Sequence, residues 1–331
     1  MLLGSLLALG ALALASCGGG DGDGTPVDAD TDPQQVLDAA LGSGGDPITS
    51  GVLDLSFKLD STEGELGSIE ASVSGPFSSN GDGELPDLDF DINAGADVGG
   101  PTLSFDGGLI LTADGLWVNY QDQSYQLDQE TFARVKDSYA KSATLREDES
   151  ESDDGSLSQF GIDPQDWLTD VSNEGTEDID GTETVHISGS GDIKRIVSDL
   201  DAVARRGGQE QLGGSEIDQL ESSVEDAEVD VYAATDDGSL RRIDVALDLT
   251  GGAGSVTLSV AIADPNSDQS IETPDEAQPL SELLNQFLGA AGAAGGGSTG
   301  GGTEDGSDAY YQCVQQAPSP DAVSDCAQLL Q

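Results

Sequence analysis

The sequence predicts an α+β fold in which one large antiparallel sheet carries amphipathic helices on its apolar face. First, apolar and polar residues alternate in run after run between Val52 and Ile262, which is the period of a half-buried strand. Second, glycine-containing turn signals separate these runs. Third, several segments have the apolar spacing of helices. An antiparallel sheet with one apolar and one solvated face must have its apolar face covered.

The expected strands follow one another along the chain. In the first, Leu53, Leu55 and Phe57 fall on one face, and the polar residues between them fall on the other. The same alternation returns at 69–73, 88–92, 103–111, 116–120, 185–187, 229–233, 243–249 and 256–262. Between them, the pairs Asp114-Gly115, Asp180-Gly181 and Asp237-Gly238 favour tight hairpin turns.

The expected helices lie between and after these strands. Each of the stronger ones opens on a capping residue, which is Asp128, Asp163, Asp192 or Ser281. Their apolar stripes are Phe132, Val135 and Tyr139; Trp167, Leu168 and Val171; Ile193, Ile196, Val197 and Leu200; and Leu283, Leu284 and Phe287. A weaker helix is expected between Ser215 and Val224.

The net charge of the chain is −53, from 64 acidic and 11 basic residues among 331. Such a charge argues against binding nucleic acid or anionic membrane surfaces by general electrostatics. The acidic residues are spread along the chain, which indicates a solvating surface rather than a specific cation site.

The N-terminal segment is an apolar run that ends in Leu14-Ala15-Ser16-Cys17 and is followed by Gly18. It resembles the lipobox of a bacterial lipoprotein signal peptide, which implies cleavage after residue 16 and lipidation of Cys17. The protein would then be anchored in the cell envelope, on the extracytoplasmic face of the membrane. An ordinary secretory signal or a short membrane helix is the alternative, although the run is shorter than the about 20 residues that span a bilayer.

Composition divides the chain into five parts. Residues 1–16 are the expected signal peptide, 17–35 a flexible tether, 36–288 the main domain, 289–307 a Gly-rich linker and 308–331 a short tail. The tail contains Cys313 and Cys326, which outside the cytoplasm are expected to form a disulfide that staples a helical hairpin.

No residue pattern in the chain predicts catalysis. His186 is the single histidine, strand alternation puts it on the polar face, and no nucleophile accompanies it at a recognisable spacing. We therefore expect no enzyme, no cofactor and no metal site.

Two adjacent arginine pairs, Arg205-Arg206 and Arg241-Arg242, stand out in so acidic a chain. The simplest explanation is a helix C-terminus for the first pair and a sheet edge after the turn at Gly238 for the second. A site for a phosphate or carboxylate headgroup is the functional alternative.

Two stretches resemble a known family. The first runs from Gly75-Pro76-Phe77 through 85–90 to 115–120, and the second covers 167–189. They are similar to the LolA/LolB-like superfamily, and within it to the actinobacterial LppX/LprG type of lipoprotein. The resemblance implies a curved half-barrel sheet whose concave face is closed by helices around an apolar cavity for acyl chains.

That resemblance yields two hypotheses. In the first, the chain is a membrane-anchored, non-enzymatic lipoprotein that binds, and transfers, lipids or lipidated molecules. In the second, it is a structural or protein-interaction lipoprotein of the envelope with a filled core. Strand alternation alone makes six apolar residues candidates for the lining of such a cavity: Leu55, Phe57, Phe90, Ile92, Leu109 and Val245. A filled core would use the same six residues.

Overall fold

A computed structural model of the chain describes residues 24–42, 48–62, 67–81, 83–97, 103–149, 164–206 and 213–286. The chain divides into two compact units, Met1–Leu283 and Leu284–Gln331. All strands of the sheet belong to the first unit.

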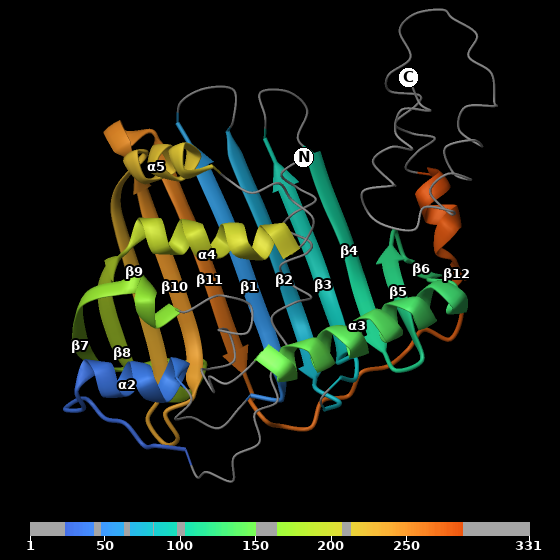
Figure 1. Cartoon of the computed structure of the whole chain (residues 1–331), viewed down its shortest axis with the longest axis horizontal. Coiled ribbons are helices and arrows are strands. Elements are labelled where there is room, and N and C mark those ends of the chain that lie inside the picture. Colours follow the sequence, from blue (N-terminus) through green and yellow to red (C-terminus); the bar gives the residue numbers. More distant parts are fainter. Residues whose placement is uncertain are drawn as a thin grey trace, which may run out of the picture. The chain divides into compact units, whose positions relative to one another are not determined.

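Twelve strands form one open sheet in the order β12-β6-β5-β4-β3-β2-β1-β11-β10-β9-β8-β7 (Figure 1). Neighbouring strands are antiparallel except for the parallel edge pair of β12 and β6. The predicted α+β class, with a large curved sheet that does not close into a barrel, is confirmed. The strands are β1 (Ser50–Ser61), β2 (Ser68–Ser78), β3 (Asp87–Ala96), β4 (Leu103–Thr112), β5 (Gly115–Tyr120), β6 (Gln123–Gln126), β7 (Leu168–Ile179), β8 (Thr182–Gly191), β9 (Val224–Ala234), β10 (Leu240–Leu249), β11 (Gly254–Ala263) and β12 (Gln278–Pro279).

The helices α2 (Pro33–Leu41), α3 (Gln129–Glu149), α4 (Ile193–Arg206) and α5 (Gly214–Ser222) lie on one face of the sheet (Figure 1). Three of them begin at an aspartate whose side chain accepts a backbone N–H of the first turn. Asp32 Oδ1 accepts from Gln34 N, Asp128 Oδ1 from Thr131 N, and Asp192 Oδ1 from Arg195 N. The predicted helices after Asp128 and Asp192, the weaker one near Ser215 and the one at 280–286 are present.

The helix predicted after Asp163 is wrong. Only one 3₁₀ turn forms there, η2 (Pro164–Trp167), and the chain then enters strand β7. Leu168 and Val171 therefore belong to a strand that pairs with β8, with a register shift between Thr169 and Ser172. Pairing along a free sheet edge satisfies more backbone groups than a short helix of weak propensity would.

The apolar face of the sheet contains two packed clusters of buried residues. Cluster 1 lies over β8, β9 and β10 and is covered by α2, η2 and α4. Its members include Val36, Leu37, Trp167, Val185, Ile187, Ile196, Val229, Val231, Ile243 and Val245. Cluster 2 lies over β1 to β4 beneath α3 and contains Leu53, Leu55, Val73, Phe77, Leu85, Leu88, Phe90, Leu111 and Phe132.

The domain body already includes residues that precede the first helix. Val27 is 5% exposed in cluster 1, and its backbone N–H donates to the carbonyl of Thr235 at 3.1 Å. Gly24 lies so close to the turn after β9 that a Cβ there would be 2.3 Å from the Asp237 carbonyl oxygen. Within the predicted tether at 17–35, Gly24 and Val27 are thus in contact with the domain body.

Candidate functional site, an apolar band between two cores

Strand β11 runs between the two clusters and is less covered than its neighbours. Its apolar side chains Val256, Leu258, Val260 and Ile262 are all only half-buried. Leu258 packs partly against cluster 1, whereas Val260 and Ile262 pack partly against cluster 2. A central strand of a covered sheet normally has the most buried face, so among the described residues β11 marks a gap in the cover.

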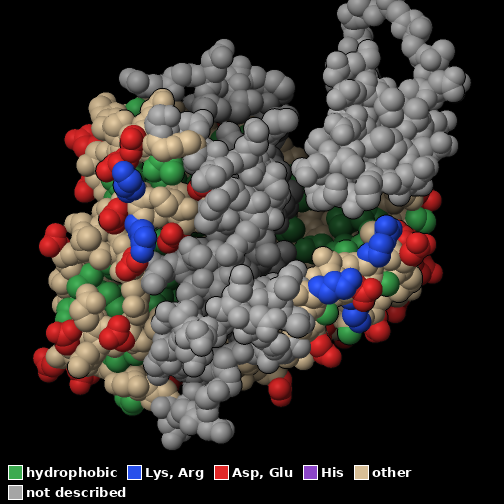
Figure 2. Space-filling model, in the orientation of Figure 1, with side chains coloured by type: hydrophobic (Ala, Val, Ile, Leu, Met, Phe, Trp, Pro, Cys, Tyr) green, Lys and Arg blue, Asp and Glu red, His purple; other side chains and the backbone are tan. Residues whose placement is uncertain are grey.

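The half-buried surface continues across the register. Phe57 of β1 is paired with Leu258 and Leu59 with Val256, and both β1 side chains are half-buried. We give the name apolar band to eleven half-buried apolar side chains on this face of β11, β1, β3, β4 and β5: Phe57, Leu59, Ile92, Phe105, Leu109, Val118, Tyr120, Val256, Leu258, Val260 and Ile262. Figure 2 shows hydrophobic side chains in a recessed area beside α3, with acidic residues around the rim of the described part.

An aromatic pair forms the β4–β5 end of the band. The rings of Phe105 and Tyr120 stack with centroids 5.7 Å apart and an interplanar angle of 13°. Gly107 follows Phe105 by two residues in β4 and is paired with Tyr120 of β5, so its Cα lies on the face of the sheet that carries both rings. A Cβ at Gly107 would be 2.8 Å from the Phe105 ring, so glycine is what allows this ring to lie flat over the strand.

The six predicted lining residues divide into two groups. Leu55 and Phe90 are buried in cluster 2, at 7% and 1% exposure, and Val245 is buried in cluster 1 at 4%. The other three, Phe57, Ile92 and Leu109, lie half-buried in the apolar band. The six thus share one face of the sheet, but three of them belong to packed cores.

The second arginine pair lies in β10, which is an interior strand between β11 and β9, and not at an edge of the sheet as predicted. Arg242 is on the polar face, where its Nε is 2.7 Å from Asp244 Oδ2 and its guanidinium carbon is 5.7 Å from the centre of the Tyr232 ring. Arg241 is the next residue toward the turn; its side chain is 13% exposed, and its Nη2 lies 3.8 Å from Asp237 Oδ2. Arg205 and Arg206 form the C-terminal end of α4, as predicted.

His186 lies on the polar face, as predicted from alternation with Val185 and Ile187. Its Nε2 is 2.8 Å from Asp230 Oδ1, and its ring stacks on Tyr232. Burial, followed by the charges of Asp230, Glu177 and Asp244, raises the pKa of Tyr232 to about 12. These side chains extend across β8, β9 and β10 on the polar face.

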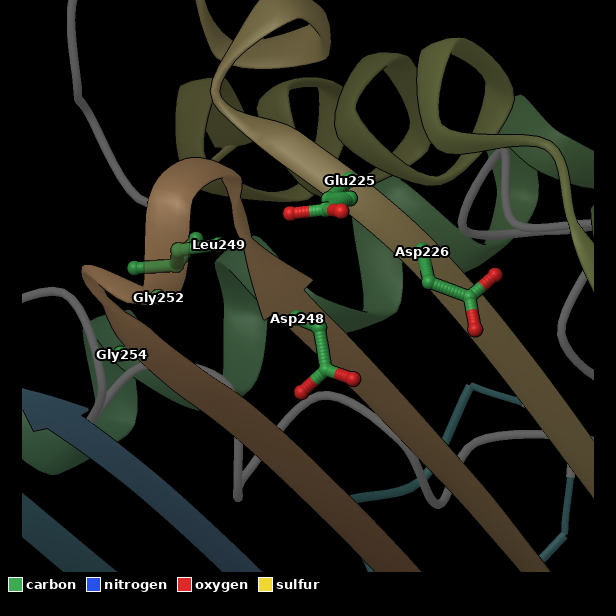
Figure 3. Close-up of a pocket in the computed structure, with 6 residues that line it drawn as sticks. All are labelled: Glu225, Asp226, Asp248, Leu249, Gly252 and Gly254. Carbon is green, nitrogen blue, oxygen red and sulfur yellow. The ribbon is translucent and has the colours of Figure 1, made fainter.

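An open hollow of about 390 Å³ lies at the ends of β9, β10 and β11. It is lined by Glu225, Asp226, Asp248, Leu249, Gly252 and Gly254, and its carboxylates do not converge on one point (Figure 3). None of the six predicted lining residues contributes to it. In the described part of the chain no group of three or more His, Cys, Asp or Glu side chains is placed to hold a metal ion.

Cys17, Cys313 and Cys326 lie outside the described residues, so the predicted lipidation and disulfide stay predictions. Within the described ranges, none of the helices combines the length and the apolarity needed to cross a bilayer.

No protein-family model and no curated protein match the chain. Among solved structures it is similar to LprF from Mycobacterium bovis, with 12% identity and a TM-score of 0.38 over 76% of this chain and 99% of that one. It is also similar to the lipoprotein LppX from Mycobacterium tuberculosis, with 16% identity and a TM-score of 0.29 over 67% of this chain and 90% of that one. A LolA superfamily protein from Nitrosomonas europaea matches with 11% identity and a TM-score of 0.19, over 74% and 96% of the two chains.

Proposed function

We propose that this chain is a lipid-anchored, non-enzymatic protein of the cell envelope that binds the acyl chains of lipids, or of lipidated molecules, in the apolar band. The observation that carries the proposal is the half-buried apolar face of β11 in the middle of a sheet whose two flanks are packed. Burying this face under an acyl chain would be favourable by about 25 cal/mol per Å² of apolar surface removed from water.

The part of the band that runs along β11 is long enough for one acyl chain. From Val256 to Ile262 the strand advances by roughly 20 Å, at about 3.3 Å per residue. One leaflet of a bilayer has a hydrocarbon thickness of about 15 Å, half of the roughly 30 Å core, and a single acyl chain fills that depth. An extended chain can therefore lie along β11 within the length that the strand offers.

The lipobox-like segment supports the proposed location. A lipid on Cys17 would hold the domain at the membrane surface, with residues 18–23 between the anchor and the first described residue. Lipid leaving the bilayer would then meet the band at high local concentration. We also propose that the protein then transfers this lipid to a second membrane or to another protein.

Native mass spectrometry tests the proposal on the full chain carrying Cys17→Ser, exported from its own cell and purified without detergent. We expect a bound lipid at one copy per chain, which solvent extraction then identifies. Leu258→Asn should lose this lipid because it puts an amide in the band. Thr257→Asn, next to it on the polar face, is the matched control and should keep it.

A structural or protein-interaction role is the second candidate, because Leu55, Phe90 and Val245 lie in packed clusters instead of lining a cavity. A lipid-free mass that stays unchanged after incubation with phospholipid vesicles would favour this role. Retention of lipid by Leu258→Asn would show that the cargo lies elsewhere than in the band.

A further inference from the structure

The residues before helix α2 are held at one end of the sheet. Gly24 lies against the carbonyl of Asp237, in the turn after β9. The backbone N–H of Val27 donates to the carbonyl of Thr235 in the same turn at 3.1 Å, and its side chain is 5% exposed within cluster 1. A buried apolar side chain and a backbone hydrogen bond together fix this segment to the domain body.

A further contact continues this attachment toward α2. Asn173 of the edge strand β7 donates from its Nδ2 to the carbonyl of Thr31 at 2.9 Å. Helix α2 then begins at Pro33 and crosses the sheet near the same end (Figure 1). The chain is thus attached at Gly24, Val27 and Thr31 before the helix begins.

This end of the sheet is formed by two neighbouring turns. The turn 180–181 joins β7 to β8, and the turn 235–239 joins β9 to β10. They lie side by side, because the backbone N–H of Thr235 donates to the carbonyl of Glu183 at 3.0 Å. We call these two turns the tethered end of the sheet.

The length of the chain limits how far this end can lie from the predicted lipid anchor. Residues 18–23 separate Cys17 from Gly24. A fully extended chain advances about 3.5 Å per residue, so Gly24 lies within about 25 Å of Cys17. If the chain were free up to residue 35, as the sequence predicts, the same arithmetic would allow about 60 Å. The attachment of Gly24 and Val27 therefore removes more than half of the reach.

We propose that the tethered end faces the membrane in which the lipid of Cys17 is inserted. This inference rests on the proposed function and adds the orientation of the domain. The far end of β9, at Glu225, lies about 30 Å from Ala234 along the strand. That end can be as far as about 55 Å from the anchor, whereas Gly24 is always within about 25 Å. Because the domain cannot pass through the bilayer, the tethered end is on average the nearer one.

This orientation also puts one end of the apolar band nearer to the bilayer. Arg242, near the start of β10, is paired with Ala261 of β11. Ile262 is the next residue of β11 and lies toward the tethered end, whereas Val256 lies toward the opposite end. Lipid leaving the membrane would therefore reach the Ile262 end of the band first.

Exposed carboxylates determine how closely the tethered end approaches the headgroups. Asp180 and Asp236 of the two turns are exposed, and so are Asp28 and Asp30 of the attached segment. They repel an anionic headgroup layer, but this repulsion is screened over about 8 Å at physiological salt, which is shorter than the reach of the tether. The tethered end is therefore expected to lie close to the headgroups without entering them.

The test is fluorescence quenching by a lipid with a nitroxide headgroup, with the full lipidated chain reconstituted into phosphatidylcholine vesicles. Single labels are attached at Asp236→Cys and Glu225→Cys, in a chain that also carries Cys313→Ser and Cys326→Ser. Both positions are exposed, both lose one carboxylate, and they lie beyond opposite ends of β9 or close to them. We expect several-fold stronger quenching at position 236 than at position 225.

Two further variants examine the cause of this difference. Glu183→Cys supplies a second exposed label beside the tethered end and should be quenched like Asp236→Cys. A Gly-Ser insert of about 12 residues after Gly20 restores the reach of a free tether without touching the described domain. It should reduce the difference between positions 236 and 225.

The outcomes separate the orientation from the anchor. If the chain does not associate with vesicles, or if Cys17→Ser associates equally well, the lipid anchor of the proposed function fails. If the chain is anchored but the labels at 236 and 225 are quenched equally, or 225 more strongly, the anchor stands and the orientation is overturned. A difference that the insert leaves unchanged would overturn the role of the short tether.

Discussion

The rings of His186 and Tyr232 lie face to face across β8 and β9, with centroids 4.5 Å apart and an interplanar angle of 11°. The guanidinium of Arg242 lies over the same tyrosine from β10. This stack joins three strands on the polar face of the sheet and keeps Tyr232 only 9% exposed. Its acidic neighbours Asp230 and Asp244 pair with the histidine and the arginine at its two ends.

Tyr232 is expected to make stability fall at alkaline pH. Its pKa is about 12 in the folded protein, because of burial and then of the nearby carboxylates, against about 10 in an unfolded chain. Between these values the folded protein keeps a proton that the unfolded chain has lost, so the free energy of unfolding decreases as pH rises. Urea unfolding at about pH 9 and about pH 11.5 should show a decrease that is smaller in Tyr232→Phe. An equal decrease in both proteins would contradict the assignment.

Asp89 is expected to be a net cost to stability at neutral pH. Burial, and secondarily the charge of Asp91, raises the pKa of its carboxyl. It is paired in the sheet with Ile110, which is 5% exposed, so the carboxylate is partly removed from water. Stability is therefore highest while Asp89 is protonated and decreases as pH rises through its folded pKa.

Asp89→Asn should then raise the free energy of unfolding at pH 7 by a modest amount, on the order of 0.5 kcal/mol. At about pH 3, where the carboxyl is protonated in both states, the substitution should have little effect. Thermal unfolding at the two pH values measures the difference. A loss of stability at pH 7 would show that the carboxylate makes a favourable interaction instead.

The two phenylalanines of the predicted lining should respond differently to truncation. Phe90 is 1% exposed in cluster 2, so Phe90→Ala should cost about 3–5 kcal/mol of unfolding free energy. Phe57 is half-buried in the apolar band, and Phe57→Ala should cost about 1 kcal/mol, since less apolar surface is lost from the interior. Chemical denaturation of both variants measures this, and equal costs would mean that the band is as tightly packed as the core.

Most strands could be predicted from the sequence because one face of each is buried, which gives the period of two. The exceptions lie toward the edges of the sheet. β6 reads Gln-Ser-Tyr-Gln, and β7 contains mainly polar residues after Leu168, so neither shows the alternation. Their strand conformation comes from pairing with a neighbour, which local sequence does not encode.

The site was only partly predictable for a related reason. Phe57 and Phe90 are both phenylalanines, and strand alternation puts both on the apolar face of the sheet. Phe57 nevertheless lies half-buried in the band, whereas Phe90 is buried in cluster 2. Which of them is covered depends on where α3 and α4 cross the sheet, and this is a tertiary property. Likewise, the register shift between Leu240 and Arg242 leaves no signature in the adjacent arginine pair itself.

The pairing of β1 with β11 also bears on how the protein reaches its folded state. Strands β1 to β6 and β7 to β11 each follow one another as neighbours in the sheet, so either half can assemble from strands that are consecutive in the chain. The ladder from Val52↔Ala263 to Ser61↔Gly254 joins the halves and requires the last long strand of the chain. Closing so large a loop is entropically costly and slow. Until then β1 and β11 are both free edges, and during export each would be open to pairing with the wrong partner.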